Sequence, residues 1–175
     1  CVFLLAKTFT FFSQEISLPK GLNSEYIFSV SPQGDPQIIT KTGTFVFKNK
    51  FVFQGYESNN EEKKPLENLK TLNNRNYKAL MDSLNTVLVL SGGGHVYSHS
   101  KQGLKRLDKS VEQQNQFNAA VFIHDKNIYM YGGYGFWAFK EYLTVFDKST
   151  EQWEIMYLNS DYIPKGRWKP VFQII

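Results

Sequence analysis

The sequence predicts an all-β protein built from small antiparallel sheets that repeat along the chain. Three observations predict it: glycine-ended segments recur at a nearly constant interval, each segment holds short β-branched and aromatic runs, and turn residues such as Asn and Asp separate these runs. The 175 residues are 42% hydrophobic and 21% charged, a globular composition that excludes disorder of the whole chain. Because the sequence holds one Cys, packing and not an internal disulfide must stabilise the fold.

The repeat is visible in the glycines. Gly55, Gly93 and Gly133 each follow an apolar run, and they lie 38 and then 40 residues apart. Residues 77–93 align without gaps with residues 117–133: each begins with an aromatic residue, has Ala two positions later, and continues with an apolar run, a polar turn, a second apolar run and paired glycines. A repeat of this period indicates one supersecondary unit stacked several times.

Each copy predicts a hairpin followed by a third strand. A shorter first copy at 43–55 holds two apolar runs around Lys48-Asn49-Lys50, and the copy at 117–133 holds two around Asp125-Lys126-Asn127. The third strands begin with Leu and close on Asn or Asp, and they are predicted at 69–73, 104–108 and 143–147.

A fourth strand completes the unit. Residues 108–113 and 147–152 agree at five of six positions, and the second segment leads into a strand at 153–155. Four strands in about 40 residues predict a β-propeller, because such a small sheet cannot bury both faces alone and must stack radially against its neighbours. We expect a partial propeller of about three four-stranded antiparallel blades and the start of another, at 38–76, 77–116, 117–163 and 164–175.

The last copy resembles a kelch repeat. Its second strand ends in Gly132-Gly133, a variable loop follows, the third strand ends in Asp147, and Trp153 stands six residues after that Asp. The middle copy keeps the glycine pair and Asp108 but has Gln114 where the family has Trp. The resemblance implies that the chain is an incomplete kelch-type β-propeller.

The match weakens towards the N-terminus, where the first copy keeps one glycine and Asn73 but has Ala79 in the Trp position. Propellers of the WD type are the alternative, since Gly94-His95 supplies their Gly-His dipeptide. The sequence has no Trp-Asp pair, however, so kelch is the family that we expect.

Residues 1–14 are predicted to be a truncated secretory signal peptide. They are apolar apart from Lys7 and a few hydroxyl and amide groups, and they are shorter than the roughly 20 apolar residues that cross a bilayer. They resemble the FSQ-ending signals of Bacteroidetes-type secreted proteins. A buried first strand is the alternative, because Lys7 interrupts the apolar run and no small-x-small cleavage site precedes Ser13. We therefore expect a secreted or periplasmic propeller domain over 15–175, with a cytoplasmic location as the alternative.

Charge argues against nucleic acid as a partner. The chain has 20 Lys and Arg against 16 Asp and Glu, a net charge of +4 that is scattered along the sequence. Arginine, which reads phosphates and base edges, occurs only at Arg75, Arg106 and Arg167. We expect neither nucleic-acid binding nor a stable membrane span.

No catalytic residue, metal site or cofactor is predicted. His95 and His99 on a strand lie about 13 Å apart, too far to share one ion. Gly92-Gly93-Gly94 is not followed by the Lys-Ser/Thr of a phosphate loop, and no G-x-S-x-G elbow occurs. Kelch-type copper oxidases resembling galactose oxidase need a Cys crosslinked to a Tyr, and Cys1 is the single thiol.

The loop after the last glycine pair is the candidate binding surface. Residues 134–142 hold five aromatic residues in nine positions, and rings on a propeller face can stack on a sugar or anchor a protein. The predicted binding residues are Tyr134, Phe136 and Trp137, together with Arg106. The alternative is that the rings pack between blades, since aromatic residues usually belong to the core.

These features predict a non-catalytic binding or scaffolding propeller that presents its loops to a protein or glycan. The alternative is a periplasmic or secreted sugar-handling enzyme similar to kelch-type sialic acid mutarotases. Such an enzyme needs Arg, Glu or His clustered at the central pore, and arginine is scarce in the repeat region, where Arg106 and Arg167 are the candidates.

Overall fold

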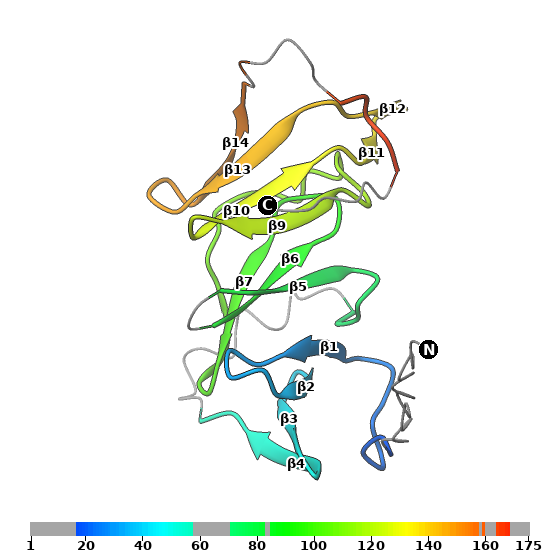
Figure 1. Ribbon diagram of the computed structural model, residues 1–175, viewed down its shortest axis with the longest axis vertical. Helices are drawn as coiled ribbons and strands as arrows, with labels where there is room; N and C mark the ends of the chain where they lie inside the picture. The colour runs from blue at the N-terminus through cyan, green and yellow to red at the C-terminus, as the bar shows by residue number, and fades with distance from the viewer. Residues whose placement is uncertain (1–16, 58–70, 83–84, 158, 160–163, 169–175) are drawn as a thin grey trace, which may run out of the picture.

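The computed structural model describes residues 17–57, 71–82, 85–157, 159 and 164–168. Every regular element among these residues is a β-strand, and the strands form three four-stranded antiparallel sheets that follow one another from bottom to top in Figure 1. The prediction of an all-β partial propeller with three four-stranded antiparallel blades is confirmed.

Each sheet is an up-and-down meander, so neighbouring strands in the sheet follow one another along the chain. The first sheet contains β1 (Ile27–Val30), β2 (Pro36–Ile39), β3 (Gly43–Lys48) and β4 (Lys50–Gly55). The second contains β5 (Tyr77–Met81), β6 (Thr86–Leu90), β7 (Val96–Ser100) and β8 (Gly103–Arg106). The third contains β9 (Ala120–His124), β10 (Asn127–Tyr131), β13 (Leu143–Asp147) and β14 (Gln152–Met156). A small hairpin of β11 (Tyr134–Gly135) and β12 (Ala138–Phe139) lies between β10 and β13.

The first strands of successive sheets are neighbours: β5 lies against β1 on one side and against β9 on the other. The Asn74 side chain joins the first two sheets, because its Oδ1 accepts from Phe28 N at 2.9 Å and its Nδ2 donates to Phe28 O at 3.1 Å. Sheets that meet along their first strands in this way are arranged as successive blades.

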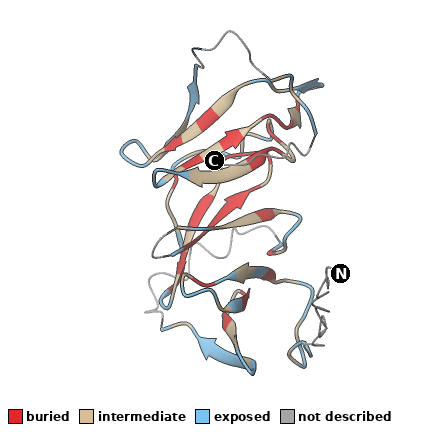
Figure 2. Cartoon of the chain, in the orientation of Figure 1, coloured by how far each residue is buried: buried red, intermediate tan, exposed pale blue. Residues whose placement is uncertain are grey.

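Strand β6 is buried on both faces, which explains its unbroken apolar sequence. Leu88 and Leu90 pack into a cluster shared with the first sheet, and Val87 and Val89 pack into one shared with the third. Figure 2 shows this contrast: buried residues fill the middle of the molecule, whereas β4 at its lower end is exposed. Each fully buried Val or Leu contributes roughly 1.5–3 kcal/mol, so the two interfaces hold the sheets together.

The two long copies occupy equivalent strands, since 77–93 contains β5 and β6 and 117–133 contains β9 and β10. The first copy was predicted to form the first two strands of its sheet, and this prediction is wrong. Residues 43–55 form β3 and β4, the third and fourth strands of their sheet, and the predicted blade boundary at residue 38 falls inside β2. Any hairpin with two apolar runs around an Asn turn has this pattern, so the spacing of 38 to the next glycine is not a blade repeat.

The third strand is predicted correctly only in the last copy, where 143–147 is β13, and the strand at 153–155 lies in β14. Residues 104–108 overlap β8, which is a fourth strand; the third strand of that sheet is β7. In the stretch 69–73, the described residues 71–73 form no strand, although Asn73 makes an isolated bridge with Tyr26.

Residues 108–113 and 147–152 are similar because both form the same turn, and not because they occupy the same position in the repeat. In both segments the Asp accepts from the backbone N–H two residues later: Ser110 N donates to Asp108 Oδ2 at 3.0 Å, and Ser149 N donates to Asp147 Oδ1 at 2.7 Å. The second turn connects β13 to β14, whereas the first lies in the connection between two sheets. The same Asx turn is thus used in two unrelated places.

Two predictions fall wholly or largely on residues outside those described: the signal peptide at 1–14 and the further blade at 164–175, of which 164–168 are described and form no strand. Within the described part of the chain, no helix has the length and apolarity needed to cross a bilayer.

Candidate functional site

The glycine loops after β6 and β10 lie against the segment that connects the second sheet to the third. Gly94 has φ +110°, and a Cβ there would lie 2.7 Å from Val111 O; Gly133 has φ +86°, and a Cβ there would lie 2.9 Å from Gln116 O. Both positions therefore require glycine for conformation and for space. The loop after β10 continues directly into the β11–β12 hairpin, which is thereby held at this end of the sheets.

The tip of the β11–β12 hairpin is formed by Phe136 and Trp137. Their φ angles are +45° and +62°, the left-handed pair that a type I′ turn requires and that Asn-Gly normally supplies. Bulky residues are rarely found in this conformation because their Cβ crowds the backbone. Phe136 is 70% exposed and Trp137 94% exposed, so these two rings do not pack between blades.

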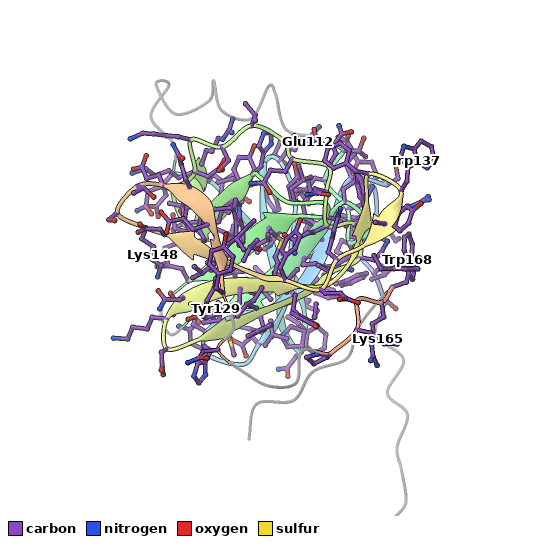
Figure 3. The ribbon with its side chains drawn as sticks, turned by 90° about the horizontal axis from the view of Figure 1, so that it is seen from above. Glu112, Tyr129, Trp137, Lys148, Lys165 and Trp168 are labelled. Atoms are coloured by element: carbon purple, nitrogen blue, oxygen red, sulfur yellow. The ribbon has the colours of Figure 1, made fainter. Side chains whose placement is uncertain are left out.

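Behind the tip, Tyr134 connects the hairpin to its surroundings. Its ring meets Phe139 edge-on at 5.3 Å and lies 6.2 Å from the ring of Trp168. Its backbone exchanges hydrogen bonds of 2.9 and 3.0 Å with Phe117, just before β9. Figure 3 shows Trp137 and Trp168 projecting on the same side of the molecule. The structure therefore brings the three predicted aromatic residues together and adds Trp168 and Phe139.

A pocket of about 470 Å³ lies next to this aromatic cluster. Its walls come from the turn before β5, the end of β6, the turn before β9 and the segment after the third sheet. The lining residues are Arg75, Asn76, Leu90, Ser91, Phe117, Asn118 and Trp168. Trp168 belongs both to the pocket and to the aromatic cluster, so the two features are continuous.

Arg106, the fourth predicted binding residue, is not joined to the hairpin by any contact that the structure records. Its guanidinium forms two hydrogen bonds with Asp108, from Nε at 3.2 Å and from Nη2 at 3.1 Å, and Nη2 also donates to Ser110 O. The Asp108 carboxylate raises the pKa of Arg106 through these bonds. Asp108 also accepts from Val96 N at 2.6 Å, so the pair fixes the connection that leaves β8.

A second hollow, of about 770 Å³, is a polar groove between the first and second sheets. Its floor is made of side chains that satisfy one another: His99 Nε2 lies 2.8 Å from Thr44 Oγ1, and Gln37 Nε2 donates to Thr86 Oγ1 at 2.9 Å. Burial lowers the pKa of His99 to about 4, so its imidazole is neutral at pH 7. These pairs stabilise the contact between the first and second sheets.

Metal chemistry has no site among the residues that the structure describes, since no three His, Cys, Asp or Glu side chains gather there. The two histidines considered above have different surroundings. His95 precedes β7 and lies 6.2 Å from the ring of Tyr97, whereas His99 lies within β7 and faces Tyr56 at 5.9 Å.

Comparison with known proteins does not assign a family, because no protein-family model matches the chain and no curated protein is significantly similar to it. The function must therefore be argued from the geometry of the aromatic cluster and its pocket.

Proposed function

We propose that this chain is a non-catalytic binding module on a kelch-type propeller and that the β11–β12 hairpin is its contact surface for a protein or glycan partner. The observation that carries the proposal is the conformation of Trp137, which is 94% exposed on a turn with positive φ. The N-terminal sequence supports a secreted or periplasmic location for such a module.

Folding alone does not account for this hairpin tip. Residues held in sparsely populated backbone regions cost about 1–3 kcal/mol each, and an exposed indole recovers almost none of the free energy that its burial would give. Strain and exposure at the same two residues are expected where a ring must be presented to a partner. Tryptophan is also among the residues that contribute most to binding when a partner covers them.

The hydrogen bonds of Arg106 favour a binding function over a catalytic one. An enzyme of the sugar-handling kind would need Arg106 available to substrate, but its guanidinium is held by Asp108 and Ser110. Rings on a projecting hairpin need no reactive group beside them to bind a partner.

The test is a binding screen of the purified protein against arrayed glycans and a panel of extracellular proteins. Trp137→Ala is expected to abolish the binding that the wild type shows. Tyr157→Ala is the matched control, because Tyr157 is 90% exposed but lies beyond β14 and outside the hairpin. Binding that survives Trp137→Ala, or that both variants lose equally, contradicts the proposal.

A further inference from the structure

We propose that the pocket beside the hairpin binds a uronate residue of an acidic glycan, with its carboxylate on Arg75 and its sugar ring on Trp168. This inference rests on the proposed binding function and specifies the partner as a glycan. It is carried by the charge, the free polar groups and the aromatic walls of the pocket.

The walls of the pocket are fixed before any ligand arrives. Asn73 Oδ1 accepts from Arg75 N at 3.0 Å and from Asn76 N at 2.8 Å, which sets the turn before β5. Ser91 N donates to Asn76 O at 2.6 Å, and the backbone of Phe117 is paired with Tyr134. The volume of about 470 Å³ lies within the range of roughly 300–1,000 Å³ typical of small-molecule sites.

The charge of the pocket selects an anion. Of the seven described residues that line it, one is a cation and none is an acid. Among the described residues, Arg75 differs from the other two arginines: Arg106 is paired with Asp108 and Arg167 Nε donates to Lys165 O, whereas the Arg75 guanidinium has no recorded partner and is exposed. A free guanidinium fork matches the two oxygens of a carboxylate.

The remaining walls suit a sugar better than a peptide side chain. Phe117 and the half-exposed Trp168 present rings on which the C–H face of a pyranose can stack. Asn118 has an amide without a recorded partner among the described residues, and Asn76 keeps its Oδ1 because its Nδ2 already donates to Thr71 O at 2.8 Å. An amide donor and an amide acceptor beside two rings can recognise ring hydroxyls and position the carboxylate towards Arg75.

The experiment compares trigalacturonate with its methyl ester, which keeps the rings and removes the charge. By calorimetric titration, the wild type is expected to bind the acid at least about tenfold more tightly than the ester, because a charge-assisted hydrogen bond contributes about 1.5–3 kcal/mol. Arg75→Gln is expected to bind both ligands equally, and Trp168→Ala to bind neither. The acid preference of the wild type is also expected to shrink as salt is added.

Equal binding of acid and ester by the wild type overturns the inference without any variant. An acid preference retained in Arg75→Gln, or tighter binding of an acidic peptide than of trigalacturonate, overturns it as well. In those cases the proposed binding function still stands if the partner found in the screen depends on Trp137. Arg75 is exposed and Trp168 is 50% exposed, so thermal unfolding of the variants is expected to match the wild type and serves as the control.

Discussion

The indole of Trp153 donates a hydrogen bond of 2.7 Å from Nε1 to the carbonyl oxygen of Gly94. Trp153 lies on β14 in the third sheet, whereas Gly94 lies in the glycine loop of the second sheet. The ring also packs on Phe146 at 5.5 Å, within the cluster between these sheets. Trp153 thus connects its own sheet to the preceding one.

Two substitutions of Trp153 can measure separately what its hydrogen bond and its packing contribute to stability. Trp153→Phe keeps an aromatic ring but loses the donor, and we expect it to lower the free energy of unfolding by about 1 kcal/mol. Trp153→Ala also removes the contact with Phe146, and we expect a loss of about 3 kcal/mol. Urea unfolding measures both values. Equal effects of the two substitutions would show that the packing on Phe146 contributes nothing, and an unchanged stability of Trp153→Phe would show the same for the hydrogen bond to Gly94.

Gly133 is required for space as well as for conformation, and Gly34 provides a control. Gly34 has φ +89°, and a Cβ added there would meet nothing within 4 Å, whereas at Gly133 the Cβ would meet backbone atoms of Gln116 and Phe117 at 2.9 Å. We expect Gly34→Ala to cost about 1 kcal/mol from φ alone, and Gly133→Ala to cost more than about 2 kcal/mol. Similar melting temperatures for the two variants would contradict the steric argument.

The architecture could be predicted because burial leaves a sequence pattern. β6 and β10 bury corresponding apolar side chains, Leu88 with Ile128 and Leu90 with Met130, and this shared pattern aligns 77–93 with 117–133. The phase of the first sheet could not be predicted, because the alternation of a hairpin is the same for first and second strands as for third and fourth. The strand ending at Asp108 was wrongly predicted to be a third strand for a similar reason, because the Asx turn of Asp108 resembles that of Asp147.

The candidate site could be predicted in part. The density of aromatic residues indicated Phe136 and Trp137, but their exposure depends on a turn whose φ angles neither residue favours. No local sequence pattern indicated Arg75 and Trp168 as site residues. They are 93 residues apart in sequence, and the fold places both in the walls of one pocket. Arg106 was predicted as a binding residue, whereas the structure pairs its guanidinium with Asp108, two residues later in the sequence.

Protonation of His99 is expected to destabilise the fold as the pH falls. Because burial lowers its pKa to about 4, the unfolded chain takes up a proton below pH 6.5 whereas the folded chain does not until about pH 4. Stability from this group is therefore complete above pH 6.5 and is lost towards pH 4, by roughly 3 kcal/mol in all. His99→Gln cannot titrate and can still bond to Thr44. Urea unfolding at pH 7 and pH 5 is expected to show a larger loss for the wild type, and identical losses would contradict a buried neutral imidazole.

We expect Phe136 and Trp137 at the hairpin tip to lower the stability of the fold and to support binding of a partner. Replacing Phe136-Trp137 with Asn-Gly supplies the residues that the turn favours, which relieves about 1–3 kcal/mol of strain at each position. The substitution also removes the contact of Lys140 Nζ over the Phe136 ring at 5.8 Å, worth about 0.5–1 kcal/mol at an exposed site. Relief of strain is the larger effect, so the double variant is expected to unfold at a higher urea concentration while binding no partner. Trp137→Ala keeps the strained backbone, and we expect it to lose binding with no gain in stability. A double variant less stable than the wild type would show that the two rings support the fold and are not presented to a partner.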